Sequence, residues 1–309
     1  MCRFENILVG LDLARREDLV AEKLSSHTEQ AYICALELAQ AFSSKLVMVY
    51  VLQVSAQTQH LLESEYLFEE TVVDKAKRRL KRLVERAAEK GVRAESRVFY
   101  GRSWDQLLRQ VPRGKHDLVV IGARQLNLFQ RLFQRSTGLK LLRSCPCPVW
   151  LARPRSPQKT SSILVAVDPT QAGQWALDAG VTLARYYHSD LHILYGFTGP
   201  EANRPGDTVQ PDAELSRMIL DRVSTARLKG TVRLQRADPD PCEAIRGYLE
   251  QQQIDLISLG SYSCESMMFD AAEKLYPRLS CSLLAVKSIP VDFVAPVLNH
   301  TARHPNPVV

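Results

Sequence analysis

The sequence has no long apolar run and no cysteine pattern typical of a disulfide framework. It contains no stretch of about 18 apolar residues, the length at which a membrane-spanning helix becomes a candidate, so we expect no membrane span. The N-terminus, Met1-Cys2-Arg3-Phe4-Glu5, has no apolar region of the kind found in secretory signal peptides. The 7 cysteines are odd in number and scattered, which favours reduced thiols over disulfide bonds. We therefore expect a cytoplasmic protein that does not bind membranes.

The sequence also lacks the common motifs of hydrolysis and metal binding. It has no Gly-x-Ser-x-Gly motif and no set of triad partners, so we expect no enzymatic activity. Cys145-Pro146-Cys147 has no matching second pair, which favours a turn with one buried cysteine over a zinc site. His188 and His192 flank a predicted turn between a helix and a strand, which favours surface histidines over metal ligands.

What the sequence does contain is a domain-sized repeat. Three segments of the first half return in the same order in the second half, and they are 7–12 with 163–168, 117–122 with 255–260, and 147–152 with 281–286. The spacing between matched segments shrinks along the chain, so the second copy has lost residues. A length of 309 residues fits two domains, and the repeat indicates that the two are duplicates.

Each half alternates short apolar runs with longer helical patterns. The expected strands are 6–11, 46–52, 94–99, 118–121 and 149–152, then 163–167, 191–196, 231–236, 255–259 and 282–286. The expected helices are 28–43, 67–90, 104–111 and 136–142, then 172–187, 212–228, 241–251 and 271–279. Gly91 follows the second helix and is typical of a helix C-cap. This alternation predicts an α/β fold with a parallel sheet covered on both faces.

Composition divides the chain into four parts. We expect a first domain at 1–153, a polar linker with two prolines at 154–161, a second domain at 162–288, and a tail at 289–309. The first 155 residues carry 26 Lys and Arg against 17 Asp and Glu, and the rest carry 14 against 17. Two halves of opposite net charge could attract each other or bind different partners, and unselected drift of surface charge is the alternative.

These segments resemble the universal stress protein family, with two of its domains fused. The resemblance rests on the Ile-Leu-Val-x-[Leu/Val]-Asp openings, on 35–39 and 117–122, and on 142–149, which resembles the tandem E-type branch. It implies a flavodoxin-like domain in each half, also described as adenine nucleotide alpha hydrolase-like, with five parallel strands. It also implies that the last strands of the halves pair across a pseudo-twofold axis, and that a homodimer or a protein partner is possible.

Nucleotide-binding members of this family carry a glycine-rich loop after the fourth strand. Its glycines let backbone N–H groups approach phosphates, and a hydroxyl at the following helix completes the anion site. Here Gly122 matches the first glycine, Gln125 and Arg135 replace the other two, and Ser136 and Thr137 keep the hydroxyl. We therefore expect weak or absent ATP binding and predict no firm cofactor.

The first half nevertheless retains groups that could contact an anionic ligand. Arginines in the loop offer guanidinium donors, although a solvated basic loop with a helix cap at Ser136 or Thr137 is the alternative. The carboxylate that ends the first strand could contact a nucleotide or could cap a turn. The candidate ligand-binding residues are Asp12, Gly122, Arg124, Arg135, Ser136 and Thr137.

The matching loop of the second half departs further from the glycine-rich pattern. Gly260 matches the first glycine, Ser263 takes the second place, and Asp270 takes the place of the hydroxyl. A carboxylate there would repel phosphate, and it could instead cap the helix, with Glu273 as its capping-box partner. We expect this site, which also includes Asp168, to be inactive.

Two further segments bear on partners. A basic stretch at 75–86 is punctuated by apolar residues at helical spacing, which favours the solvated face of an amphipathic helix over a nucleic-acid surface. The segment 53–67 is rich in apolar residues and could cover a hydrophobic small molecule, whereas its counterpart 199–211 is polar. The favoured hypothesis is a non-enzymatic stress-survival factor that binds a ligand or a protein. The alternative is a nucleotide-binding switch that hydrolyses ATP slowly.

Overall fold

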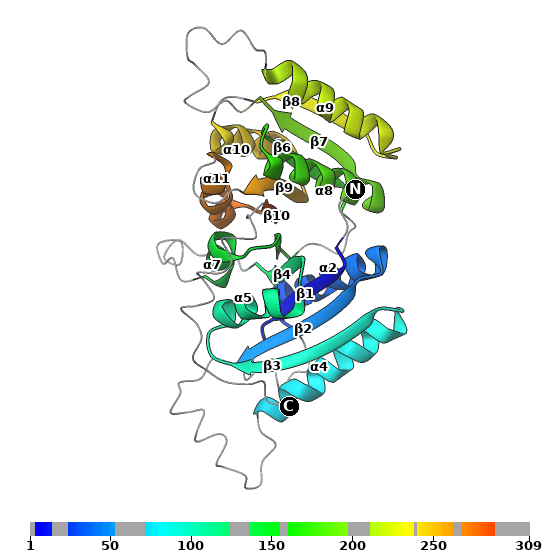
Figure 1. Cartoon of the computed structure of the whole chain (residues 1–309), viewed down its shortest axis with the longest axis vertical. Helices are drawn as coiled ribbons and strands as arrows, with labels where there is room; N and C mark the ends of the chain where they lie inside the picture. Colours follow the sequence, from blue (N-terminus) through cyan, green and yellow to red (C-terminus); the bar gives the residue numbers. More distant parts are fainter. Residues whose placement is uncertain are drawn as a thin grey trace. The chain divides into compact units, whose positions relative to one another are not determined.

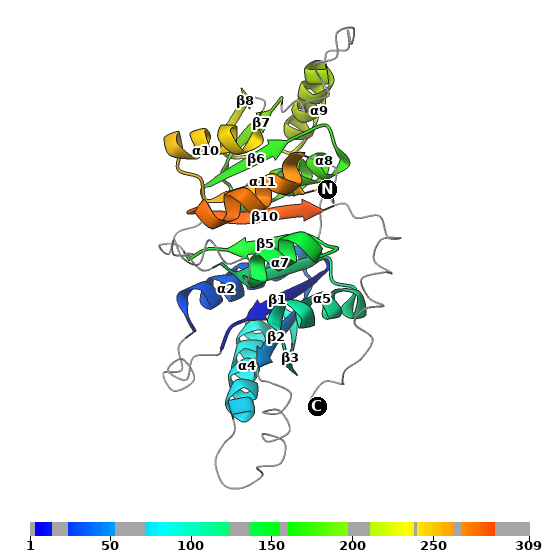
Figure 2. The same ribbon diagram turned by 90° about the vertical axis from the view of Figure 1, so that its left-hand side faces the viewer.

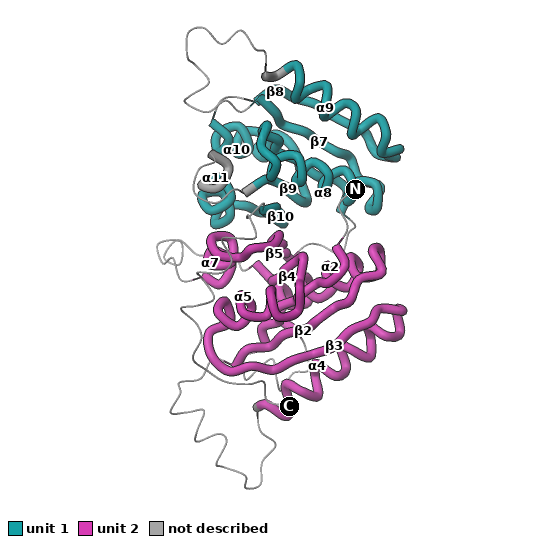
Figure 3. The backbone as a smooth tube through the Cα atoms, viewed as in Figure 1, with its two compact units in different colours: residues 1–3, 125–134, 155–289 teal, residues 4–124, 135–154, 290–309 magenta. Residues whose placement is uncertain are grey.

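The computed structural model describes residues 4–13, 24–52, 72–123, 136–154, 160–196, 211–237, 240–261 and 267–287. Within that part the chain forms two compact units, coloured separately in Figure 3. One holds the described residues up to 154 and is called the first half. The other holds those from 160 onward and is called the second half. The domain boundaries and the linker at 154–161 stay predictions, and residues 155–159 lie outside the described part.

The first half is a five-stranded parallel sheet with helices between its strands (Figure 1). Its strand order is β3-β2-β1-β4-β5, and every described pairing is parallel. The elements along the chain are β1 (Asn6–Leu11), α2 (Ser26–Phe42), β2 (Lys45–Leu52), α4 (Val72–Glu89), β3 (Arg93–Tyr100), α5 (Ser103–Gly114), β4 (Leu118–Gly122), α7 (Thr137–Ser144) and β5 (Val149–Ala152).

The second half repeats this topology, with the strand order β8-β7-β6-β9-β10. Its elements are β6 (Ser162–Val167), α8 (Gln171–Tyr187), β7 (Asp190–Tyr195), α9 (Pro211–Thr225), β8 (Val232–Arg236), α10 (Pro241–Gln251), β9 (Leu256–Ser261), α11 (Met267–Leu275), the 3-10 turn η1 (Tyr276–Arg278) and β10 (Ser282–Lys287). The predicted α/β fold class and the ten predicted strands are confirmed.

Helices cover both faces of each sheet. In the first half α2 and α4 share one face, where the Tyr32 hydroxyl donates to the Leu83 carbonyl at 3.0 Å. Helices α5 and α7 contact each other on the other face, and Figures 1 and 2 show the two layers. Because both faces are covered, the central strands are buried along their length, as in Ile7, Leu8 and Val9 of β1.

The helix ends follow local chemistry. Gly91 lies after α4 with φ +74, its N–H donates to Ala88 O at 2.8 Å, and Val92 N–H donates to Ala87 O at 2.9 Å. This is a Schellman motif, so the predicted C-cap at Gly91 is confirmed. Helices α2 and α8 instead end at Ser43 and His188, which adopt left-handed φ values of 56 and 57 without glycine. No helix in the described ranges combines the length and apolar character needed to span a bilayer.

Candidate functional site

The topology places a candidate site at the carboxyl ends of β1 and β4. These two strands are neighbours, and the chain leaves them toward opposite sides of the sheet, so the strand order switches between them. Ligands of open α/β sheets bind in the crevice outside such a switch point. Asp12 follows β1 and Gly122 ends β4, and in the second half Asp168 and Gly260 hold the same places after β6 and in β9.

Asp12 lies beside the first turn of α2. Its backbone carbonyl accepts a hydrogen bond from the Thr28 hydroxyl at 3.1 Å, and its carboxylate Oδ2 lies 3.9 Å from Nε2 of His27. The Ser25 hydroxyl lies 3.1 Å from the same nitrogen. The Asp12 side chain is 38% exposed and that of His27 is 15% exposed. The arrangement therefore offers a solvent-accessible carboxylate next to an imidazole and a hydroxyl.

Gly122 and Gly260 have a packing role. A Cβ atom on Gly122 would meet the carbonyl oxygen of His27 and would lie 2.6 Å from its carbonyl carbon. A Cβ atom on Gly260 would lie 2.6 Å from both Ala172 C and Gly173 N. In each half the first turn of a helix therefore packs directly on the end of the fourth strand, and only glycine fits there. This packing would require both glycines even without a phosphate ligand.

Ser136 caps the helix that follows the loop. Its Oγ accepts a hydrogen bond from Leu139 N at 3.1 Å, and α7 begins at Thr137. The predicted cap at this position is confirmed at Ser136. The loop itself, with Arg124, Gln125, Arg131 and Arg135, lies outside the described residues, so a role of these arginines in ligand binding stays a prediction.

Sequence reasoning missed Tyr50 of β2. Tyr50 pairs with Leu11 of β1, is 1% exposed, and has a hydroxyl with no hydrogen-bond partner among the described residues. Burial and the negative charge of Asp12 raise the pKa of Tyr50 to about 12. A signal was present in the repeat, because Tyr195 pairs with Val167 at the same position of the second half. Tyr50 lies in a run of apolar residues, which indicates a buried strand and not a site residue.

Asp168 is engaged differently from Asp12. Its Oδ1 accepts hydrogen bonds from the Thr170 hydroxyl and from Thr170 N, the latter at 3.1 Å, and Thr170 in turn caps α8 by accepting from Gly173 N at 3.1 Å. Asp168 is 7% exposed, and burial raises the pKa of its carboxyl although the Thr170 hydrogen bonds act to lower it. Asp168 therefore caps a turn, which is the alternative that the sequence left open for the matching Asp12.

The cap predicted at Asp270 is wrong. Helix α11 begins at Met267, so Asp270 lies inside the first turn of the helix and not before it. The helical pattern extends toward the amino end because no glycine or proline separates 267–269 from Asp270. Ser263 lies outside the described residues, and the inactivity expected of the second-half loop stays a prediction.

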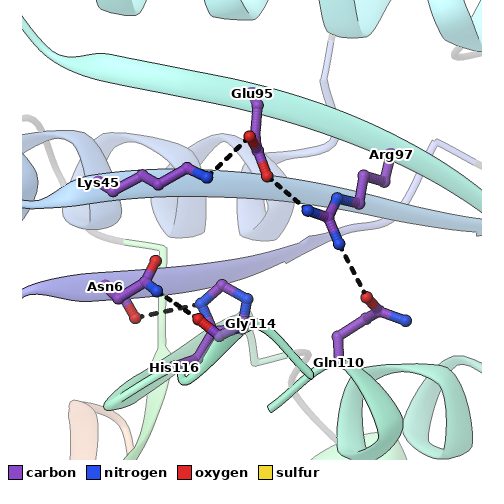
Figure 4. A network of polar contacts seen from close by, with 7 residues as sticks. All are labelled: Asn6, Lys45, Glu95, Arg97, Gln110, Gly114 and His116. Carbon is purple, nitrogen blue, oxygen red and sulfur yellow. Dashed lines mark hydrogen bonds and ion pairs between the residues drawn. The ribbon is translucent and has the colours of Figure 1, made fainter. Parts of the chain in front are cut away.

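A polar network lies at the opposite end of the first sheet, near the amino ends of its strands (Figure 4). Glu95 accepts from Lys45 Nζ at 2.8 Å and from Arg97 Nη2 at 2.7 Å, and Arg97 Nη1 donates to the buried Gln110 at 3.2 Å. His116 Nδ1 lies 3.2 Å from the carbonyl of Asn6. Burial, with Arg97 and Lys45 adding to it, lowers the pKa of His116. The network joins β1, β2, β3 and α5, and it is remote from the candidate site.

His188 and His192 differ in their surroundings. His188 is exposed, as predicted, whereas the surface position predicted for His192 is wrong. His192 is 4% exposed because β7 is covered on both faces, and its Nδ1 lies 2.6 Å from the Tyr248 hydroxyl of α10. Across the residues that the structure describes, no three His, Cys, Asp or Glu side chains are arranged to hold a metal ion.

The Cys145–Cys147 turn holds two buried thiols, where one was predicted. Cys145 is 0% exposed and Cys147 is 8% exposed, and their Sγ atoms lie 3.7 Å apart.

On α4, the apolar side chains of Ala76, Leu80 and Leu83 are buried, and basic side chains face solvent. The exposed basic residues are Lys75, Arg78, Lys81, Arg82 and Arg86.

Comparisons with known proteins agree with this architecture. The profile of the universal stress protein family matches residues 3–153. A universal stress protein of Thermus aquaticus is 31% identical over 140 residues, which cover 44% of this chain and 96% of that protein. The universal stress protein E homolog of Haemophilus influenzae is 21% identical over 92% of this chain and 98% of its own length.

A solved structure extends the agreement in fold to nearly the whole chain. A universal stress protein from Archaeoglobus fulgidus superposes with a TM-score of 0.63 at 16% sequence identity, and the match covers 91% of this chain and 98% of that one. Both halves thus have the fold seen in that protein, and the Thermus relative shows the family. The chain belongs to the universal stress protein family, with two of its domains in tandem.

Proposed function

We propose that this protein is a non-enzymatic stress-response factor of the cytoplasm that binds a ligand at the carboxyl ends of β1 and β4 in its first half. The difference between the two matched aspartates carries the proposal. The Asp12 side chain is 38% exposed, whereas the whole Asp168 residue is 7% exposed and is held by Thr170. A ligand can reach the first carboxylate, and the second already serves the helix cap.

The groups around Asp12 favour a ligand with both donors and acceptors. The Asp12 carboxylate accepts hydrogen bonds, while the His27 ring can donate them. Gln125 and Arg135 replace two phosphate-loop glycines, and side chains at these places keep backbone N–H groups away from phosphates. Together with the apolar segment 53–67, these groups favour a hydrophobic small molecule with a polar end over ATP.

The alternative function is a nucleotide-binding switch. It is favoured by Ser136 and Thr137 at the amino end of α7, where a helix dipole attracts anions, and by the arginines Arg124 and Arg135. Against it, the Ser136 hydroxyl already caps α7. Pairing of the two halves through their last strands, a homodimer and a protein partner are further proposals, and none of them requires nucleotide.

Native mass spectrometry of the purified full chain tests the proposal. We expect a small molecule to remain bound to the wild-type protein and to be lost in Asp12→Asn. Asp168→Asn is the matched control, since it keeps a side-chain oxygen for Thr170, and we expect it to retain the ligand. Absence of any bound molecule, or equal loss in both variants, would contradict ligand binding in the first half.

A further inference from the structure

The turn between α7 and β5 brings two thiols into contact. Cys145 follows the last residue of α7, and its N–H donates to Leu141 O at 2.9 Å. Cys147 lies two residues further on, and its Sγ is 3.7 Å from that of Cys145, within hydrogen-bond distance for sulfur. The remaining described cysteines are Cys34, Cys242 and Cys281.

The backbone holds this contact in place. Each of the two cysteines precedes a proline, and a residue before proline is restricted to extended conformations. Cys145 has φ −74 and ψ 128, as this restriction requires. On the far side, Pro148 O accepts from Val119 N of β4 at 2.9 Å. The turn is therefore fixed at both ends, by α7 and by β4, and its two thiols are held close together before any bond forms.

The spacing permits a disulfide bond. Two residues separated by one other lie at most about 7 Å apart at Cα, close to the range of about 4.4–6.8 Å that disulfides span. The Sγ atoms, now 3.7 Å apart, would have to approach to about 2.05 Å. Rotation about the side-chain bonds can supply much of this change.

We propose that Cys145 and Cys147 form a reversible redox pair that a hydroperoxide oxidises to a disulfide. Cys147, the more exposed of the two, reacts with hydrogen peroxide to give a sulfenic acid and water. The sulfur of Cys145 then attacks the Cys147 sulfur, the S–O bond breaks, and the hydroxide leaves as water with the proton of Cys145. A dithiol restores both thiols by exchange. This inference is independent of the ligand-binding proposal.

The duplicate supplies an internal comparison. Cys281 stands before β10 where Cys147 stands before β5, but Leu279 takes the place of Cys145. Both Leu279 and Cys281 are buried, so the second half fills the same position with a side chain that cannot form a disulfide. The thiol pair is therefore specific to the first half. It lies in the turn between β5 and α7, the helix that Ser136 caps.

The test uses the full reduced chain treated with graded hydrogen peroxide. Free thiols are then alkylated under denaturing conditions. Mass spectrometry measures the mass of the tryptic peptide 144–155, which contains these two cysteines and no other. We expect this peptide to lose two hydrogen atoms and to resist alkylation until a dithiol is added. Two separately alkylated cysteines, under peroxide that oxidises the more exposed Cys242, would overturn the proposal.

Variants separate the two thiols. Cys145→Ser should let a sulfenic acid accumulate at Cys147, where dimedone traps it, and Cys147→Ser should abolish the disulfide. Cys281→Ser is the matched control, since it removes a buried thiol from the same position of the other half, and the disulfide should persist in it. Loss of the disulfide in Cys281→Ser would also overturn the proposal, because it would identify a different partner thiol.

Discussion

Two buried tyrosines illustrate how the hydroxyl of one residue type can have opposite effects on stability. Tyr50 buries its hydroxyl without a described partner, whereas the Tyr248 hydroxyl lies 2.6 Å from His192 Nδ1. A buried polar group without a partner costs about 1–3 kcal/mol, and a satisfied one contributes about 1 kcal/mol.

Replacement of each tyrosine by phenylalanine should therefore change stability in opposite directions. We expect Tyr50→Phe to raise the free energy of unfolding by about 1 kcal/mol and Tyr248→Phe to lower it by about 1 kcal/mol. Chemical denaturation of the two variants measures both changes. If Tyr50→Phe destabilises the protein as much as Tyr248→Phe does, the Tyr50 hydroxyl has a hydrogen-bond partner inside the protein.

At the scale of the elements, the packing of a helix against the end of a strand determines which residue can occupy that strand end. Helix α2 packs its first turn on Gly122 of β4, and α8 packs its first turn on Gly260 of β9. These glycines would be required even if neither half bound a nucleotide. Matching glycines in the sequence therefore does not by itself indicate phosphate binding.

Gly122→Ala should be strongly destabilising for this reason. The added Cβ meets backbone atoms of His27, which cannot rotate away, and we expect a loss of about 2–3 kcal/mol. Gly247→Ala is the control, because a Cβ there has no neighbour within 4 Å and alanine favours the helix α10 by about 1 kcal/mol. Thermal unfolding that ranks the two variants in the reverse order would contradict the packing assigned to Gly122.

The strands and most helices could be predicted from the sequence, because parallel strands buried on both faces are continuous apolar runs. The start of α11 could not, since the shortened loop before it leaves no glycine or proline to mark the boundary. The burial of His192 could not either, because a histidine in an apolar strand is compatible with an edge or a covered position. The position of Asp12 after β1 could be predicted from the repeat and the cap at Ser136 from motif spacing, but the difference between Asp12 and Asp168 depends on Thr170.

At the scale of the whole molecule, two buried histidines connect stability to pH. Burial lowers the pKa of His116 and of His192, and nearby cations, Lys45 and Arg97 for the first and Arg233 for the second, lower each pKa further. Below the ordinary histidine pKa of about 6.5, the unfolded chain takes up protons that the folded chain does not. The stability that these residues supply is therefore complete above that pH and is lost as the pH falls.

We accordingly expect the midpoint of thermal unfolding to fall between pH 7 and pH 5. His192→Gln and His116→Gln should each show a smaller fall over this range than the wild-type protein, whatever their stability at pH 7. A control is His188→Gln, because His188 is exposed. Equal pH dependence in all four proteins would show that the buried histidines do not carry the effect.

The duplication explains which features the two halves share and shows where they differ. Both halves keep the strand order and the glycine contacts, whereas the aspartates after their first strands have come to differ. The second carboxylate supports the amino end of α8, and the first stays accessible. The scaffold is thus retained twice, and we expect that neither half retains a phosphate loop that binds ATP tightly.

Titration calorimetry of the full chain with ATP and Mg²⁺ tests that claim most directly. Because Gln125 and Arg135 replace loop glycines and Asp270 lies in the first turn of α11, we predict a dissociation constant far above the micromolar range for both halves. A dissociation constant of about 1 µM or lower, which corresponds to a binding free energy of about −8 kcal/mol, would contradict the account.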